Sequence, residues 1–189
     1  MMQKIFLSTA TAAALTFNAA WADDVTNRIQ ELAENQLSGW LSSPNLIEAI
    51  RNQNEKHAGL SQADIDSLDQ AWRGQAAAGE GPMIADLLSR SVSQYLRDQQ
   101  SNSDGLVAEV FIMDNLGLNV AQSDPTSDYW QGDEAKFQKT FGKGAGTIHI
   151  GEVELDDSSG YYQVQVSMTI SDPDDGSAIG AATFGISME

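Results

Sequence analysis

The 189-residue sequence contains no cysteine. Thiol catalysis, zinc–thiolate sites and haem attached through cysteine are therefore excluded, and an oxidising compartment is tolerated without disulfides. Basic residues are also few, 10 against 27 acidic ones, which gives a formal net charge of −17. Such a surface repels nucleic acid and anionic lipid by Coulomb repulsion, so neither is an expected partner.

Histidine is scarce as well, since the chain has only His57 and His149. They lie far apart in the sequence, and no Gly-x-Ser-x-Gly elbow accompanies the serines. The acidic turn Asp172–Gly176 lacks the spacing and the final glutamate of an EF-hand calcium loop. We therefore expect no catalytic site, no metal site and no cofactor, and hence a protein that is not an enzyme.

A long apolar run occurs only at the start of the chain. Lys4 precedes mainly apolar and small residues from 5 to 20, and Ala20-Trp21-Ala22 fits the small-x-small pattern at which signal peptides are cut. The run is short for a membrane-spanning helix, which needs about 20 apolar residues. We expect residues 1–22 to be a secretory signal peptide cut after Ala22. The mature chain is then periplasmic or secreted, without insertion into a membrane.

Residues 23–81 have the apolar spacing of helices. Pro44 after Ser43 is typical of the first turn of a helix, which we expect to run to His57. Ser61-Gln62-Ala63-Asp64 resembles a capping box that opens the next helix. Gly79-Glu80-Gly81 is a break, and a further helix is predicted from Pro82 through Leu96.

From about residue 106 the apolar pattern becomes that of strands. Strands are predicted over 106–113, 118–122, 146–155, 161–171 and 178–188, with a short helix over 133–141. Turn signals rich in Asp, Asn, Gly and Pro separate the strands. This order predicts one α+β domain, in which N-terminal helices pack on one face of a five-stranded antiparallel PAS-like sheet.

Two segments carry a family resemblance, EVFIMDNLGLNVAQSDPTSDYWQGDEAKFQKTF and YYQVQVSMTISDPDDGSAIGAATFGISM. The first resembles the first hairpin and the ligand-side loop and helix of the Cache (PDC) family of extracytoplasmic PAS-like sensor domains. The second resembles the last hairpin of that family. On this resemblance, residues 82–189 form the sensor domain and 23–81 form a helical region before it.

The resemblance implies a sensory module that binds a small ligand, usually as the outer part of a chemoreceptor or a membrane histidine kinase. No membrane-spanning segment or signalling domain follows Met188, and the arginine-tryptophan-tyrosine signature of amino-acid-binding members is not found. We therefore expect a solitary module that signals through a separate membrane receptor or histidine kinase. The alternative is a periplasmic protein-interaction or regulatory subunit that uses the helices of residues 23–77. Formation of a homodimer through the N-terminal helix stays open.

The loop after the second strand supplies the first candidate ligand residues, because the family keeps its ligand-side cover there. Tyr129 and Trp130 would form aromatic walls of a pocket. Asp128 would take a ligand amine and Lys136 a carboxylate. Trp130 is equally suited to fill the core beneath the loop.

The same segment holds two residues with expected structural roles. Asp133 is expected to cap the short helix that follows, and Phe137 to lie in the core.

The strand over 161–171 alternates between apolar and polar residues. Tyr162, Val164, Val166, Met168 and Ile170 share the apolar face. The polar row either faces water or, if both faces of the sheet are covered, lines a pocket with Gln163, Gln165 and Ser167. Asp172 follows the strand and either reaches a ligand amine or, as we favour, forms the turn. Together these candidates suit a small polar or cationic ligand.

Overall fold

The computed structural model describes residues 24–155 and 162–188. The predicted signal peptide and the predicted turn over 156–160 lie outside the described residues. Helical residues from Asp24 pass through the π-helical turn η1 (Ala33–Leu37) into α2 (Ser38–Leu41). The remaining helical elements are α3 (Pro44–His57), α4 (Gln62–Ala78), α5 (Pro82–Ser89), α6 (Ser91–Ser101), α7 (Ala135–Gln138) and the 3-10 turn η2 (Phe141–Lys143).

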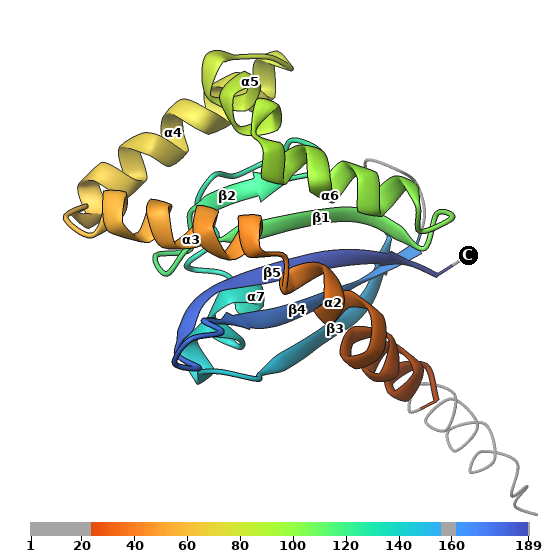
Figure 1. Ribbon diagram of the computed structural model, residues 1–189. Coiled ribbons are helices and arrows are strands. Elements are labelled where there is room, and N and C mark those ends of the chain that lie inside the picture. The colour runs from red at the N-terminus through yellow and green to blue at the C-terminus, as the bar shows by residue number, and fades with distance from the viewer. Residues whose placement is uncertain (1–23, 156–161, 189) are drawn as a thin grey trace, which may run out of the picture.

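Five antiparallel strands form one sheet in the order β2-β1-β5-β4-β3, with the early helices before it in the chain (Figure 1). The α+β class and the five-stranded antiparallel sheet expected from the sequence are therefore confirmed. The strands are β1 (Val107–Met113), β2 (Asn119–Gln122), β3 (Ile148–Leu155), β4 (Tyr162–Ser171) and β5 (Ala178–Ser187).

Local signals set the helix boundaries, with two differences from expectation. The capping box of Ser61 and Asp64 forms at the start of α4. The helix predicted from Pro82 to Leu96 is broken at Arg90, whose extended backbone separates α5 from α6. The expectation that Asp133 caps a helix is wrong, because α7 begins only at Ala135 and its N-cap residue is Glu134.

One face of the sheet is covered by helical residues before β1, as Figure 1 shows for α2, α3 and α6. Strand alternation aims the apolar side chains of β1, β4 and β5 at these helices. Trp40 of α2 meets Phe184 of β5 edge to face, with ring centroids 5.7 Å apart. Tyr162, expected on this apolar face, is instead 59% exposed at the start of β4.

The opposite face is covered by α7 and η2. Phe111, Met113 and Ala181 of the sheet pack there against Phe137, whose ring stacks on Phe141 at 5.1 Å between centroids. The expected core position of Phe137 is confirmed. Helical elements thus lie over both faces of the sheet. The polar side chains of β4 point to the face that α7 and η2 cover.

A second, smaller core joins α4 and α5 to the loop after β2; we call this unit the α4–α5 lobe. Figure 1 shows α4 and α5 beyond the β2 edge of the sheet. The loop and β2 edge are linked to each other by an isolated bridge between Leu118 and Trp130. The buried apolar residues of the lobe are Ile65, Trp72, Ile84, Leu87, Leu118 and Tyr129.

Gly117 allows the loop after β2 to lie close to the β1–β2 turn. Its φ of +84° suits glycine, and a Cβ there would lie 2.6 Å from Cα of Gly132. The two glycines therefore let the backbones of the turn and the loop meet.

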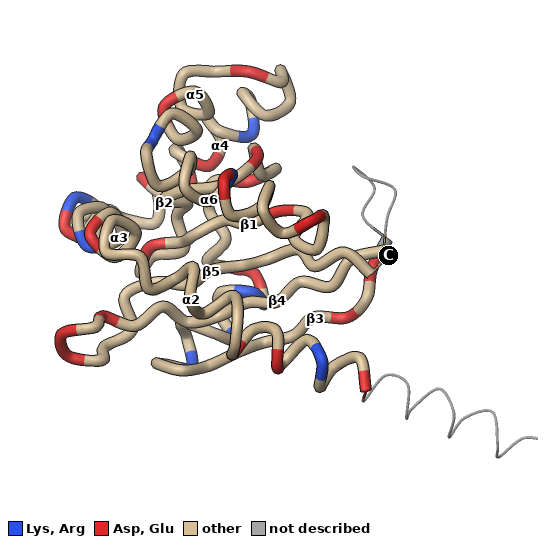
Figure 2. Tube along the Cα trace, turned by 45° about the vertical axis from the view of Figure 1, so that its right-hand side comes forward, with Lys and Arg blue, Asp and Glu red and all other residues tan. Residues whose placement is uncertain are grey.

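Acidic residues are spread over helices and loops on several sides of the molecule (Figure 2). Across the part of the chain that the structure describes, no helix combines the length and the apolar character needed to cross a membrane.

Candidate functional site

A cavity of about 420 Å³ lies between α7 and strands β3 and β4, on the sheet face away from α3 and α6. This volume falls within the range of small-molecule sites in proteins. The lining residues are Glu134, Ala135, Lys136, Lys139, His149, Ile150, Gly151, Glu152, Glu154, Gln165 and Ser167. We call it the sheet cavity.

Lys136 of α7 supplies a partly buried cation to the sheet cavity. Its side chain is 15% exposed, and Nζ lies 2.9 Å from Oε2 of Glu134. Nζ also donates to Oε1 of Gln131 at 3.2 Å and lies 5.3 Å from the ring centroid of Phe111. An ammonium group has three N–H donors, so these two polar contacts leave one donor for a ligand oxygen.

Strand β4 forms the polar floor. Ser167 is buried, and its hydroxyl shares a hydrogen bond of 3.0 Å with that of Thr183 on β5. Gln165 lies two residues before Ser167 and therefore on the same face, half-buried. These groups give a ligand fixed donors and acceptors at the base of the cavity.

His149 of β3 stands opposite Ser167 in the strand pairing. Partial burial first, and the positive charge of Lys139 second, lower the pKa of His149 below its ordinary value of 6.5. The imidazole is therefore mainly neutral at pH 7 and can both donate and accept a hydrogen bond.

The edge strand β3 adds two carboxylates because of a β-bulge. The pairing with β4 shifts between Ile150 and Val153. The extra residue changes which face the later side chains occupy, so Glu152 and Glu154 line the same cavity as His149. Regular alternation would place them opposite His149, and the sequence reasoning did not select these residues or Lys139.

Three of the eight predicted ligand residues meet at the sheet cavity, namely Lys136, Gln165 and Ser167. Gln163 of β4 instead lines a separate hollow, together with Gln100 and Asp124.

Asp172 lies in the β4–β5 turn. Its carboxylate accepts a hydrogen bond of 2.7 Å from Nε of Arg51, and its backbone N–H donates to Ser177. Asp172 therefore lies in the turn, as favoured from the sequence.

Asp128, Tyr129 and Trp130 lie in the α4–α5 lobe and do not line the sheet cavity. Asp128 pairs with Arg73 at 2.7 Å. Nε1 of Trp130 donates to the carbonyl of Leu116 at 2.8 Å. The structure thus separates the aromatic pair from the polar row of β4, although the sequence grouped them.

No cluster of three or more His, Asp or Glu side chains suited to a metal ion occurs among residues 24–155 and 162–188.

Neither a protein-family model nor a curated protein matches this chain. Solved structures do match, among them a domain of a sensory box/GGDEF family protein from Vibrio parahaemolyticus. That match has 15% identity and a TM-score of 0.48, and covers 95% of this chain and 61% of the other.

Two further matches are ligand-binding domains of chemoreceptors. One is PctC of Pseudomonas aeruginosa in complex with GABA, with 14% identity, a TM-score of 0.42, and coverage of 86% of this chain and 61% of the other. The other is Tlp3 of Campylobacter jejuni, with 15% identity, a TM-score of 0.39, and coverage of 82% and 62%.

The chain spans less than two thirds of the length of each of these structures. By their names, the matched structures are sensory and ligand-binding domains.

Proposed function

We propose that this protein is a sensor module that binds a small polar molecule in the sheet cavity and has no catalytic activity. The proposal rests on the polar groups that line the cavity between α7 and the sheet. Ser167 and Gln165 form its floor, and the partly buried ammonium of Lys136 lies at its side. A cavity with a few convergent polar groups is what recognition of a small ligand requires.

The charges around the cavity favour a ligand with both polar and cationic groups. Lys136 and Lys139 can donate to a ligand oxygen, whereas Glu134, Glu152 and Glu154 can accept from a ligand amine. Either end of a zwitterionic molecule would therefore find a partner, and a small polar or cationic molecule would find one at the carboxylates.

The proposed module acts outside the cytoplasm, as a secreted or periplasmic protein, and reports to a separate membrane receptor or histidine kinase. Its moving part is α7, a single short turn that contributes Lys136 to the cavity and Phe137 to the core. A ligand that binds one position of α7 better than another shifts the balance between them, and a partner can read that shift.

A thermal-shift screen with small amines, amino acids and polyamines tests the proposal. A ligand that binds only the folded state raises Tm in a concentration-dependent way. The variant Lys136→Met should lose the shift, whereas Lys143→Met, an exposed lysine of η2 outside the cavity, should keep it. Equal loss in both variants, or no stabilisation by any compound, would count against the proposal.

A further inference from the structure

A second cavity, of about 400 Å³, lies between the N-terminal helical residues and strands β3 and β4, and it shares no lining residue with the sheet cavity. Its residues come from η1, α2, the start of α3, the start of β3 and the end of β4. The helix of α2 ends at Leu41, and α3 begins at Pro44 in a different direction, as Figure 1 shows. We call the cavity between these helices and the sheet the helix-side cavity.

The floor of the helix-side cavity is apolar. Met168 and Ile170 of β4 are buried and lie two residues apart, so they point to the same face. Thr169 between them belongs by strand alternation to the face that α7 covers. On the helical side, Leu41 and Ile47 are buried as well. The hydrocarbon part of a ligand would therefore gain free energy by leaving water for this surface.

The polar groups at the rim of the cavity are acceptors of hydrogen bonds. The hydroxyls of Ser38 and Ser42 each donate to a backbone carbonyl of the preceding helical turn, at 2.7 and 2.9 Å. The hydroxyl of Thr147 donates to the carbonyl of Gly144 at 3.0 Å. A hydroxyl has one proton and two lone pairs, so these three oxygens can still accept but no longer donate. They suit a ligand that brings its own N–H donors.

Glu34 of η1 supplies the charge of the helix-side cavity. It is the one charged side chain among the described residues that line this space. Its carboxylate accepts from Nε2 of Gln30 at 2.6 Å, and a carboxylate has about four lone-pair sites, so further donors can bind there. Ser38 follows four residues later on the same side of the helix, which brings its hydroxyl oxygen towards the same donor.

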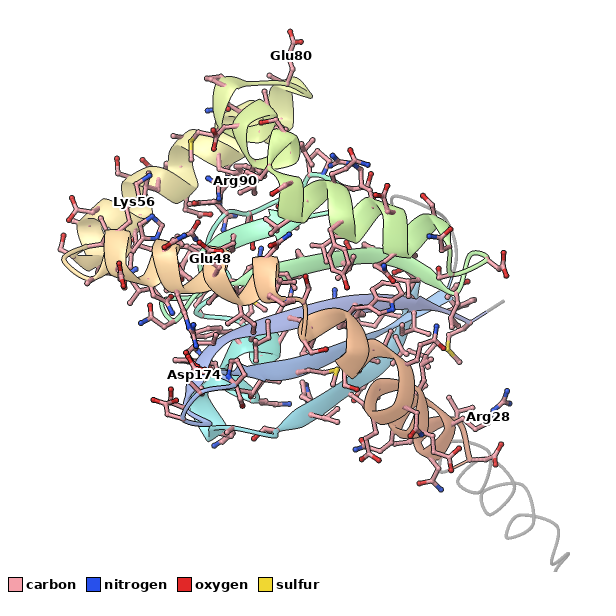
Figure 3. All side chains as sticks on the ribbon, viewed as in Figure 1. Arg28, Glu48, Lys56, Glu80, Arg90 and Asp174 are labelled. Atoms are coloured by element: carbon pink, nitrogen blue, oxygen red, sulfur yellow. The ribbon has the colours of Figure 1, made fainter. Side chains whose placement is uncertain are left out.

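The elements that border the cavity carry further negative charge. Figure 3 shows Glu48 on α3 and Asp174 in the turn between β4 and β5. Arg51 of α3 is already paired with Asp172 and Asp174, so its positive charge is offset within that group. A cationic ligand is therefore favoured over an anionic one.

We propose that the helix-side cavity is a second ligand site, which binds an alkyl monoamine. The ammonium group donates to the carboxylate of Glu34 and to the hydroxyl oxygen of Ser38, and the alkyl chain packs on Met168 and Ile170. Charge-assisted hydrogen bonds to the carboxylate make the ammonium group a stronger donor than a neutral hydroxyl. The volume falls within the range of small-molecule sites. This site lies beyond the proposed function and does not depend on it.

The lining also restricts the tail of the ligand. A second charge at the far end of the tail would be buried against the apolar floor without a partner of opposite sign, which is unfavourable. Amino acids of the ω-amino type and diamines are therefore disfavoured relative to a monoamine of the same length.

The test is a titration of the full chain with hexylamine, followed by calorimetry and by the methyl resonances of the methionines. We expect binding with a shift of the Met168 methyl resonance, because Met168 lines the helix-side cavity. The methyl resonance of Met113 should stay in place, since Met113 is buried on the α7 face of the sheet.

Three related compounds test the chemistry of the ligand. Hexanol lacks the charge and 6-aminohexanoate adds a carboxylate to the tail, so each should bind at least about tenfold more weakly than hexylamine. Butylamine has two CH₂ groups fewer and should bind about tenfold more weakly. Hexanol or 6-aminohexanoate that binds as tightly as hexylamine would overturn the proposal.

The variant Glu34→Gln keeps the size of the side chain and removes its charge, so it should weaken hexylamine binding about tenfold. Glu34 is exposed, so the fold is expected to be retained. Glu31→Gln is the matched control, because Glu31 is exposed on the same helix and does not line the cavity. Equal affinity of Glu34→Gln and the original protein would overturn the proposal, as would absence of any hexylamine binding.

The location of the resonance shifts separates this site from the sheet cavity. A Met168 shift that is kept in Lys136→Met and weakened in Glu34→Gln supports the helix-side cavity. A shift of the His149 imidazole resonance without any shift of Met168 places the amine in the sheet cavity, which His149 lines. That result overturns the present inference while it leaves the proposed function standing.

Discussion

The ring of Tyr129 stacks on the indole of Trp72, with centroids 5.4 Å apart and an angle of 26° between the planes. Trp72 is fully buried, and its Nε1 donates to the carbonyl of Thr126 at 2.8 Å. One residue of α4 thus holds both ends of the loop segment from Thr126 to Tyr129. The aromatic residues of this loop belong to the α4–α5 lobe.

Trp72→Ala should lower the free energy of unfolding by about 3–5 kcal/mol, because it removes the largest fully buried side chain and leaves a cavity. Chemical denaturation measures the change. Trp72→Phe, which keeps an aromatic ring for Tyr129, should cost clearly less. A loss below about 1 kcal/mol for Trp72→Ala would contradict the role given to this side chain.

Asp69 is the second point at which α4 holds the loop. Its Oδ1 accepts from the backbone N–H groups of Tyr129 and Trp130 at 2.9 and 3.0 Å, and its Oδ2 accepts from Arg73. Asp69→Ala leaves two backbone donors without their partner, so we expect a loss of at least about 2 kcal/mol in denaturation experiments.

The matched control is Asp66→Ala, because Asp66 is exposed on the same helix and accepts a side-chain hydrogen bond from Gln62. That variant should stay within about 0.5 kcal/mol of the original protein. Similar losses for the two aspartates would show that Asp69 does not hold the loop.

Trp130→Ala addresses the choice that the sequence left open between a pocket wall and a core residue. The indole is partly buried in the lobe and donates to Leu116, away from the sheet cavity. We expect a loss of about 1–3 kcal/mol in unfolding free energy. Affinity for a ligand of the sheet cavity, measured by calorimetry, should be unchanged; a large loss of affinity in a folded variant would make Trp130 a ligand residue.

The Arg51–Asp172 pair predicts a dependence of stability on pH. Hydrogen bonds from Arg51, and next from the backbone N–H of Asp174, hold the pKa of Asp172 below its ordinary value of 3.8. The folded state therefore binds fewer protons than the unfolded state as pH falls through this window. The stabilisation is fully present above the ordinary pKa and is lost as pH falls through the lowered one.

Denaturation at several pH values compares Asp172→Asn with the original protein. The difference in unfolding free energy should be constant from pH 5 to 7 and should shrink as pH falls below about 4. Arg51→Gln should remove much of this pH dependence while Asp172 is still present. A difference that stays constant down to pH 2 would contradict the assignment.

The sequence predicted the fold well where local patterns and tertiary packing agree. Alternation in β4 correctly placed Val164 and Val166 in the core, and the capping box at Ser61 correctly opened α4. Arg90 shows where such patterns fail: nothing in the apolar spacing reveals that its extended backbone ends α5.

The sequence predicted only part of the site, and the structure gives two physical reasons for this. The β-bulge after Ile150 reverses the faces of the later residues of β3, so simple alternation misplaces Glu152 and Glu154. Tyr129 and Trp130 follow β2 in the chain as expected, but Asp69, some 60 residues earlier, draws them into the α4–α5 lobe. Such long-range contacts cannot be predicted from the local pattern of residues.

The two glutamines of β4 give the most direct test of the sheet cavity as a ligand site. Gln165 lines that cavity, whereas Gln163, two residues earlier on the same strand, lines a different hollow. Calorimetry with a compound that raises Tm should be run on Gln165→Ala and Gln163→Ala side by side. We predict that Gln165→Ala weakens binding about tenfold and that Gln163→Ala leaves it unchanged. Unchanged affinity in Gln165→Ala, or equal losses in both variants, would contradict a ligand site at this cavity.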